Sequence, residues 1–351
     1  LWNVPHVRPE SACGHIESTQ KFERRAREFS ADMWFPGPGP WIEWKPNGSD
    51  RPSQKMKEER PELLNADGRT LLYHEVVADA PVDAPWLVFV HGAGGSIRTW
   101  KYQIEAFRPH YRLLLIDLRD HGYSKDILPE FPEYDFDIVG EDILAVIDHL
   151  GIVKAHFVSL SIGSVILQKL DIERPELIDR MVMAGAIFDG SRLMHLFVHS
   201  GKLLNYILPY QAIYWLFSYI VLPRRNHRMS RWIFRRQSRR LTPGEYLKWV
   251  ELYKPFFQLI KAYVNRKVDK HGLVVMGSQD HIFFGAAEKF AQAQKNMRLA
   301  VIENCGHVCS IEAPELFNEL VLKFLSGKEI PLRVQATPVP STWAELKALK
   351  G

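Results

Sequence analysis

The sequence has few cysteines, no apolar leader and little net charge. Three cysteines, Cys13, Cys305 and Cys309, occur among 351 residues, and their spacing fits neither a zinc site nor a disulfide framework. Residues 1–12 carry prolines and charges but no apolar segment typical of a secretion signal. The net charge of +4 is too small to indicate a nucleic-acid partner. These absences favour a cytoplasmic protein with reduced thiols, without a metal site and without a nucleic-acid partner.

Regular periodicity is missing from residues 1–61, which contain the Pro-Gly stretch 35–40 and four tryptophans. Prolines remove backbone donors and glycines add chain entropy, so this segment is expected to be a partly irregular N-terminal extension. The tryptophans favour docking of part of it on another surface.

Short apolar runs alternate with helical spacing from about residue 62 onwards. The runs Trp86–Val90 and Leu113–Ile116 are typical of strands buried on both faces of a sheet, and Asp135–Leu150 has its apolar residues on one side of a helix. This alternation predicts an α/β fold with a doubly wound, mostly parallel sheet. Further strands are expected at 70–78, 156–160, 180–184, 273–276 and 299–302, and further helices at 161–172, about 286–295 and 313–325.

The alternation of strands and helices is interrupted over residues 189–264, where no strand pattern occurs. A helical cap is therefore expected between the two core segments, 62–188 and 265–326. The proline-containing residues 327–351 are expected to form a C-terminal tail on the surface.

Ser161 is the candidate nucleophile. It lies where an apolar strand ends and a helix begins, with the small residues Ser159 and Gly163 two positions before and after it. A sharp strand-to-helix turn requires small residues there, because neighbouring backbone passes close to them. Such a turn directs the backbone N–H of Ile162 towards a developing oxyanion. A serine in this position is also a common helix N-cap without any chemistry.

A glycine-rich loop, His91 to Gly95, follows the strand Trp86–Val90. Gly92 and Gly94 allow the backbone to fold beneath a substrate, and the N–H of Ala93 is the candidate second donor of an oxyanion hole. His91 is interpreted as a structural residue that supports the loop. An ordinary glycine turn is the alternative interpretation.

Asp280 and His307 are the candidate acid and base, and each follows an apolar strand. The carboxyl ends of parallel strands meet at the edge of the sheet where ligands bind. His307 would take the proton of Ser161 and return it to the leaving group, while Asp280 would orient the imidazole and stabilise the imidazolium. Asp280 could instead be a helix cap and His307 a surface histidine, and Asp189 is a rival acid.

These stretches together resemble the alpha/beta hydrolase superfamily over about residues 62–326. The similar motifs are His91–Gly95, Asp117–Ser124, Ser159–Gly163, Gly277–Asp280 and Gly306-His307. The chain looks most like the capped serine esterases, monoacylglycerol-type lipases and carbon–carbon bond hydrolases. This resemblance implies hydrolysis without a cofactor. Relatives usually carry Gly where this chain has Asp120, and epoxide hydrolase and haloalkane dehalogenase relatives use Asp as the nucleophile, against which Ser161 argues.

Acidic residues are absent between Ser191 and Leu241, a stretch with ten lysines and arginines. The residues Leu203–Leu222 contain no charge at all. Helical spacing predicts one cationic face formed by Arg224, Arg228, Arg231, Arg235 and Arg239, with an apolar face beside it formed by Met229, Trp232 and Ile233.

The cap allows several interpretations. Its apolar residues could roof an acyl or aromatic pocket, with Trp215, Phe217, Arg231 and Trp232 as candidate substrate-binding residues. The arginines could also contact an anionic membrane peripherally, or simply form a solvated basic face. A membrane span over Leu203–Leu222 is disfavoured, because Pro209 and polar residues interrupt it.

Three functions remain open from the sequence. The first is a serine hydrolase that cleaves a hydrophobic acyl or aryl ester, such as a lipid-like one, through an acyl-enzyme on Ser161. The second is a carbon–carbon bond hydrolase or lyase that uses the same residues on a carboxylated substrate, held by the cap arginines. The third is a non-catalytic protein that uses its pocket as a receptor. The expected partner is a small-molecule ester, and no cofactor is expected.

Overall fold

The computed structural model describes residues 70–125, 131, 134–188, 199–200, 203–204, 207–239 and 241–336. The expected N-terminal extension, the rival acid Asp189 and residues 337–351 of the expected tail lie outside the described residues.

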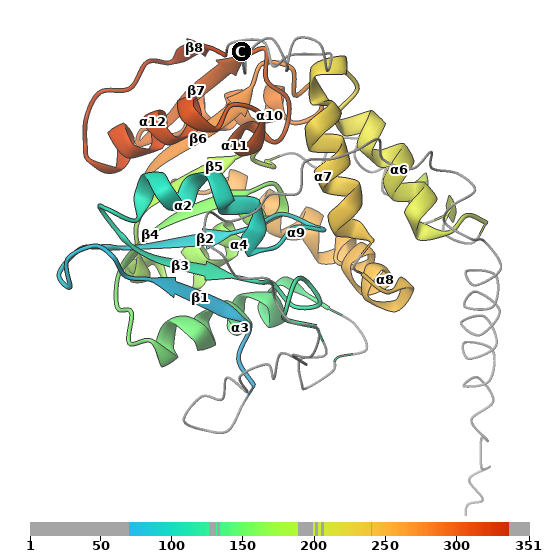
Figure 1. The fold of residues 1–351 in the computed structure, drawn as a ribbon, viewed down its shortest axis with the longest axis horizontal. Coiled ribbons are helices and arrows are strands. Elements are labelled where there is room, and N and C mark those ends of the chain that lie inside the picture. The colour runs from blue at the N-terminus through green and yellow to red at the C-terminus, as the bar shows by residue number, and fades with distance from the viewer. Residues whose placement is uncertain are drawn as a thin grey trace, which may run out of the picture.

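A single eight-stranded sheet forms the centre of the described chain, in the order β1-β3-β2-β4-β5-β6-β7-β8. Strand β1 pairs antiparallel with β3, and every other neighbouring pair is parallel. The predicted mostly parallel, doubly wound sheet is therefore confirmed (Figure 1). The strands are β1 His74–Val77, β2 Trp86–Val90, β3 Arg112–Ile116, β4 Ala155–Leu160, β5 Ile178–Ala184, β6 His271–Gly277, β7 Met297–Glu303 and β8 Arg333–Gln335.

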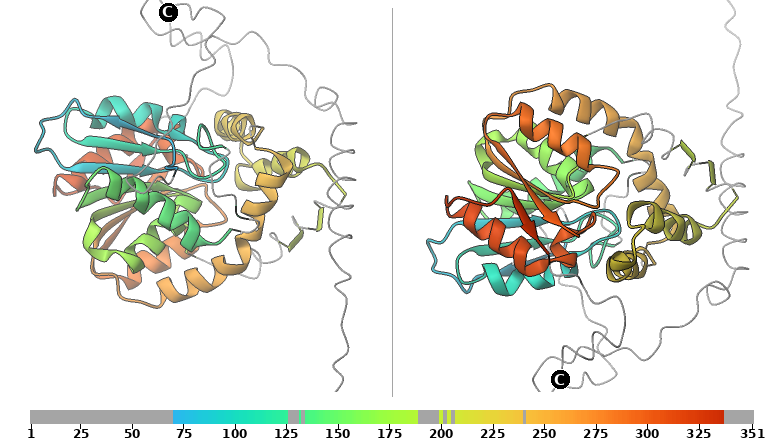
Figure 2. Two further views of the ribbon diagram at one scale, coloured as in Figure 1. Left: turned by 90° about the horizontal axis from the view of Figure 1, so that it is seen from below. Right: turned by 90° about the horizontal axis from the view of Figure 1, so that it is seen from above.

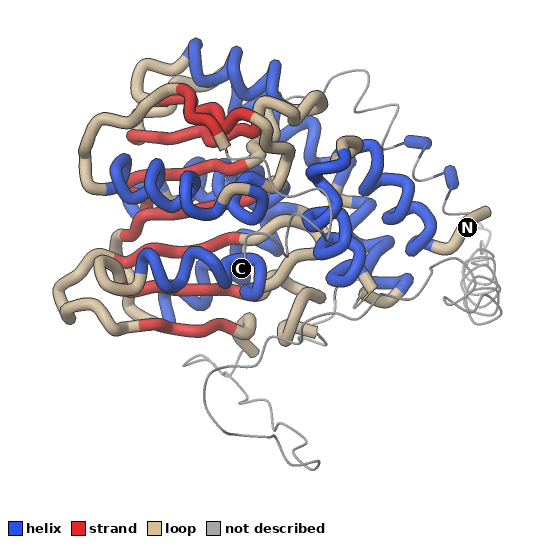
Figure 3. Tube along the Cα trace, turned by 45° about the horizontal axis from the view of Figure 1, so that its top comes forward, coloured by secondary structure: helices blue, strands red, loops and turns tan. Residues whose placement is uncertain are grey.

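Helices cover both faces of the sheet (Figure 3). The strands alternate their side chains between two apolar layers, so that Val88 of β2 packs with the layer containing α3 and α4, whereas Phe89 packs with the layer containing α2 and α12. Because both layers exclude water, the inner strands read as continuous apolar runs. The core helices are α2 Lys101–Phe107, α3 Phe136–His149, α4 Ile162–Glu173, α10 Phe284–Ala293, α11 Cys309–Glu312 and α12 Pro314–Leu325, with the short 3-10 helices η2 Ile97–Trp100 and η3 Pro175–Leu177.

The expected cap range contains α6 Tyr210–Val221, η4 Arg225–His227, α7 Arg228–Ser238, α8 Pro243–Glu251 and α9 Tyr253–Val264. Helices α6 and α7 lie against each other and stand apart from the sheet (Figure 2). Helix α9 instead packs on α4, where Phe256, Ile260 and Tyr263 join the core of the sheet. The helical region is therefore divided between a projecting part and a part that belongs to the core layer.

Helix α2 and strand β8 are among the elements that the sequence did not predict. Helix α2 packs against α12, with Phe107 fully buried between the helices and the sheet. Strand β8 lies within the expected tail and extends the sheet by pairing with β7. At three residues, of which two are polar, β8 is too short to show a period in the sequence.

None of the described helices combines the length and apolar character that crossing a bilayer requires. Within Leu203–Leu222 the described helix α6 begins only after Pro209 and covers 12 residues.

Candidate active site

Ser161 occupies the tight turn between β4 and α4, with φ 55° and ψ −121°. This positive φ is unfavourable for a residue with a side chain and is held by the packing around it. A Cβ on Gly163 would lie 2.5 Å from the carbonyl oxygen of Val90, so only glycine fits as β2 and α4 approach. Ser159 is fully buried and its hydroxyl donates to the carbonyl of Val182 at 3.1 Å, which accommodates a serine two residues before the turn.

The turn brings Ser161 to His307 and Asp280. The Oγ of Ser161 lies 2.9 Å from Nε2 of His307, and the other ring nitrogen, Nδ1, lies 2.7 Å from Oδ2 of Asp280. Asp280 is completely buried, and its Oδ1 accepts a hydrogen bond from the backbone N–H of Phe283 at 3.1 Å. The phenyl ring of Phe283 also packs against the imidazole, with centroids 4.9 Å apart. The three side chains therefore form a hydrogen-bonded chain that starts at the Ser161 hydroxyl.

Close backbone packing fixes the loop that carries His307. A Cβ on Gly185, which has φ 50°, would lie 2.5 Å from the carbonyl oxygen of His307. Glu312 of α11 accepts hydrogen bonds from the N–H of Gly306 at 2.6 Å and from the N–H of Val308 at 3.3 Å. One buried carboxylate thus holds the backbone on both sides of the imidazole.

Two buried histidines hold the glycine-rich loop. The N–H of Leu118 donates to Nε2 of His91 at 3.0 Å, so the Nδ1–H of His91 donates to the carbonyl of Gly92 at 2.8 Å. The N–H of Gly94 donates to Nε2 of His121 at 2.9 Å. Burial is the largest cause that lowers the pKa of His91 to about 3 and that of His121 to about 4. Both imidazoles are therefore neutral and accept hydrogen bonds from the backbone.

The loop lies directly beneath the serine. A Cβ on Gly92 would be 3.1 Å from Cβ of Ser161, and the backbone N–H of Gly95 closes a turn onto the carbonyl of Gly92 at 2.9 Å. Ala93 and Ile162, the expected oxyanion donors, are both partly exposed and flank the partly exposed Ser161 on the loop and on α4. This arrangement leaves the serine accessible at the edge of an otherwise buried framework.

A comparison with known protein families agrees with this geometry. The family model described as alpha/beta hydrolase family matches residues 87–320, which include the glycine-rich loop, the Ser161 turn, Asp280 and His307. This chain belongs to the alpha/beta hydrolase family.

Individual proteins are also similar to this chain. The 3-oxoadipate enol-lactonase 2 of Acinetobacter baylyi is 35% identical over 102 residues, which cover 29% of this chain and 37% of the lactonase. The epoxide hydrolase 1 of Caenorhabditis elegans is 22% identical over 307 residues, covering 78% of this chain and 74% of that protein. A crystal structure of a hydrolase from Pseudomonas aeruginosa shares the fold with a TM-score of 0.63 and 23% identity, over 75% of this chain and 97% of that one.

The expected substrate-binding residues of this hydrolase lie on α6 and α7. Trp215 and Trp232 are exposed, and Phe217 packs against Phe234 with centroids 5.8 Å apart. The guanidinium of Arg231 donates to the carbonyl oxygens of Leu222 and Arg224 at the end of α6. No described contact joins any of the four to Ser161, Asp280 or His307.

The arginines of α7 share one side of the helix, as their spacing predicted, but Arg231 and Arg235 on that side lie over the ring of Tyr219 of α6. Arg231 and Arg235 turn towards α6, where Arg235 donates to the hydroxyl of Ser218 at 2.8 Å. Trp232 and Met229, expected on a separate apolar face, are exposed together with Arg228. The arginine side of α7 faces α6 because α6 packs along it and because the carboxyl-terminal carbonyls of α6 attract cations.

Contact between the projecting helices and the site is made by η4. The amide of Asn226 donates to the side-chain oxygen of Gln279 and to the carbonyl of Asn304, both at 2.9 Å. Nε2 of the buried His227 lies 2.8 Å from the same Gln279 oxygen, and burial lowers the pKa of His227. Gln279 and Asn304 precede Asp280 and His307 by one and three residues, so η4 is anchored beside the acid and the base.

Sequence reasoning did not single out Glu312, His121 or His227. Glu312 follows His307 by five residues, and a carboxylate so close to the candidate base was a usable signal. His121 and His227 are brought to the site only by tertiary packing, and no local spacing marks them. Asp120 adopts φ 62°, which matches the glycine usual in relatives, and its carboxylate accepts from the hydroxyl of Tyr134 at 2.7 Å.

Neither a metal site nor a disulfide occurs in the part of the chain that the structure describes. No group of three or more His, Cys, Asp or Glu residues there could hold a metal ion. Cys305 and Cys309 are buried free thiols, and burial raises the pKa of both.

Proposed function

We propose that this protein is a serine hydrolase that cleaves a hydrophobic carboxylic ester through an acyl-enzyme. The observation that carries the proposal is the chain of two short contacts from Ser161 through His307 to Asp280, at 2.9 and 2.7 Å. An alcohol next to a neutral imidazole, itself oriented by a buried carboxylate, is the arrangement that makes serine nucleophilic near neutral pH.

The proposed reaction has two steps. Ser161 Oγ attacks the ester carbonyl while Nε2 of His307 takes its proton, and Asp280 stabilises the resulting imidazolium through Nδ1. The backbone N–H groups of Ala93 and Ile162 donate to the oxyanion of the tetrahedral intermediate. His307 then gives the proton to the departing alkoxide, which leaves as an alcohol. Water, deprotonated by His307, attacks the acyl carbonyl, and His307 returns that proton to Ser161 Oγ as the C–O bond of the acyl-enzyme breaks, which releases the acid and the free serine.

Several observations favour ester hydrolysis over the other candidate reactions. The similar Acinetobacter protein is named an enol-lactonase, and a lactone is a cyclic ester. Ser161 stands where epoxide hydrolases of the family use Asp. The carbon–carbon bond alternative drew on cap arginines that hold a carboxylate, but Arg231 already donates to two backbone carbonyls. The aromatic composition of α6 favours an apolar acyl or aryl group.

Covalent labelling tests the nucleophile. Wild-type protein is expected to form one adduct with a fluorophosphonate probe, and Ser161→Ala is expected to form none, because the probe requires an activated alcohol. Ser326→Ala removes an exposed serine hydroxyl and serves as the matched control, with labelling equal to wild type. Absence of an adduct on wild type, or an adduct of equal yield on Ser161→Ala, contradicts the proposal.

A panel of p-nitrophenyl esters of increasing acyl length tests the reaction and its substrate class. Turnover is expected to increase from acetate towards longer chains, and kcat of His307→Ala is expected to fall by about 10³-fold or more. Weak turnover at every acyl length, together with intact probe labelling, would favour the carbon–carbon bond reaction instead. Failure of both assays in wild type would support a non-catalytic receptor.

A further inference from the structure

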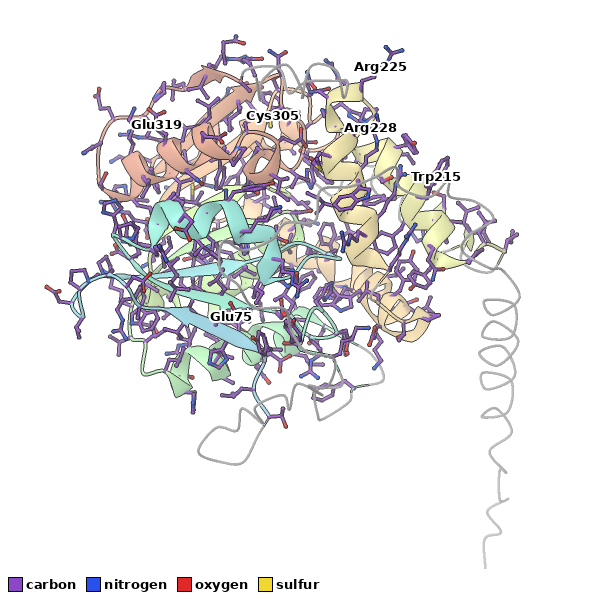
Figure 4. All side chains as sticks on the ribbon, in the orientation of Figure 1. Glu75, Trp215, Arg225, Arg228, Cys305 and Glu319 are labelled. Atoms are coloured by element: carbon purple, nitrogen blue, oxygen red, sulfur yellow. The ribbon has the colours of Figure 1, made fainter. Side chains whose placement is uncertain are left out.

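The outer surface of the projecting helices exposes aromatic and cationic side chains side by side. Trp215, Leu216 and Tyr219 of α6 are each 40–41% exposed, and Trp232 of α7 is 36% exposed. Arg228 and Arg236 are exposed on the same side of α7 as Trp232, one turn before and after it. We refer to these six residues as the cap surface. Trp215 lies on the side of the cap that faces away from the sheet (Figure 4).

Cationic side chains of α7 lie close to aromatic rings on both helices. The rings of Trp215 and Tyr219 lie 4.8 Å apart on α6. The guanidinium of Arg235, which comes from α7, lies 5.5 Å from the ring of Trp215 and 4.6 Å from that of Tyr219. On α7 itself the guanidinium of Arg236 lies 5.1 Å from the ring of Trp232. Arginine side chains therefore lie next to exposed aromatic rings of both helices.

The charge of this region is of one sign. The stretch from Ser191 to Leu241, which supplies both helices, has ten lysines and arginines and no acidic residue. An anionic partner would therefore meet no repulsive carboxylate from this stretch. Exposed tryptophan and leucine beside these cations favour a partner that offers a negative surface with an apolar interior beneath it. A purely polar polyanion would gain nothing from Leu216 or from the apolar faces of the indoles.

We propose that the cap surface docks on an anionic lipid bilayer. Arg228 and Arg236 contact lipid phosphates, while Trp215, Leu216 and Trp232 enter the headgroup region. The docking is peripheral, because the two helices lie in the interface rather than crossing it. This inference concerns binding alone and does not depend on the proposed esterase reaction.

Co-sedimentation of the full chain with vesicles tests the proposal. Binding is expected to vesicles of phosphatidylcholine with 30% phosphatidylglycerol, to be weak with phosphatidylcholine alone, and to decrease with added salt. Arg228→Gln/Arg236→Gln is expected to weaken the partition coefficient about tenfold or more, at roughly a few-fold for each charge removed from the bilayer surface. The matched control, Lys295→Gln/Lys328→Gln, removes the same charge from exposed positions outside the cap and is expected to bind like wild type.

A second variant separates a bilayer from other occupants of the cap surface. Trp215→Ala/Trp232→Ala keeps the charge and is expected to weaken vesicle binding at least tenfold, with the circular dichroism spectrum unchanged. Undiminished binding of this variant would overturn the proposal in favour of a soluble polyanion. Wild-type binding that is equal on neutral and anionic vesicles, or absent on anionic vesicles, would also overturn it. So would a cap-surface variant that keeps vesicle binding and loses only self-association in sedimentation velocity.

Discussion

The buried histidines His91 and His121 show how single residues maintain the site. Each imidazole accepts a backbone N–H with one nitrogen and faces a backbone carbonyl with the other, at 2.8 to 3.0 Å. A second proton would place two donors opposite each other in a buried place, in addition to the cost of burying the charge. These residues therefore hold the glycine-rich loop only while they are neutral.

Acid is accordingly expected to destabilise the fold through these two side chains. Their folded-state pKa values, about 3 and about 4, lie below the ordinary 6.5, so the unfolded chain binds more protons in this range. Stability is fully present above pH 6.5 and is lost as the pH falls towards 4, by up to about 1.4 kcal/mol per pH unit for each histidine. Urea unfolding of wild type and His121→Asn between pH 4.5 and 7.5 measures this. The variant is expected to be less stable at pH 7 but to show a shallower pH dependence, and parallel profiles would contradict this account.

Among the elements, the four-residue helix α11 has an effect out of proportion to its length. Its last residue, Glu312, binds the N–H groups of Gly306 and Val308, on either side of His307. The helix thereby fixes the backbone of the loop that carries His307. Glu312 is a positioning residue, since none of its described contacts reaches Ser161 or Asp280.

Replacing Glu312 by Gln is expected to lower kcat on the best p-nitrophenyl ester about tenfold and to leave KM within about twofold. An amide presents an N–H₂ group to one of the two backbone donors, and a misplaced base slows proton transfer without altering substrate binding. Steady-state kinetics separates the two parameters. Glu319→Gln, an exposed change on the neighbouring α12, is the control and is expected to match wild type. A rise in KM with unchanged kcat would show that Glu312 shapes the substrate pocket instead.

At the scale of the whole molecule, two of the described contacts between the cap helices and the core support the site. One is η4, where Asn226 donates to Gln279 and to the carbonyl of Asn304. The other is Trp249 of α8, whose buried ring stands edge-on to the imidazole of His121 at 4.7 Å. The cap thus contacts the loops that carry Asp280 and His307. Through His121 it also contacts the residue that holds the glycine-rich loop.

Two tryptophans of the cap, Trp249 and Trp232, should therefore differ in their effect on stability. Trp249→Ala is expected to lower the free energy of unfolding by about 3 kcal/mol or more, because it leaves a cavity between cap and core. Trp232→Ala, at an exposed position, is expected to change it by less than about 0.5 kcal/mol. Guanidinium denaturation followed by circular dichroism gives both values. Similar losses for the two variants would contradict the assignment of Trp249 as the contact between cap and core.

The sequence by itself determined the alternation of strands and helices, and the order serine, acid, histidine at three strand ends. Apolar runs such as Trp86–Val90 can be buried only with both faces covered, which requires a parallel sheet with helices on each side. The small residues Ser159 and Gly163, two positions before and after Ser161, indicated the tight turn because the steric need for small residues there is local. These features depend on neighbours along the chain, and local pattern therefore reveals them.

Only the tertiary structure decided which distant side chains support the site and which way the cap residues face. Helical spacing places Arg231 and Arg235 on one side of α7, but the direction of that side depends on α6, whose carbonyls and aromatic rings attract the cations. The contacts of His121, His227 and Glu312 likewise arise from the packing of elements that a one-dimensional pattern does not orient. Hydrogen bonds and burial of this kind are properties of the assembled surfaces, so no spacing along the chain encodes them.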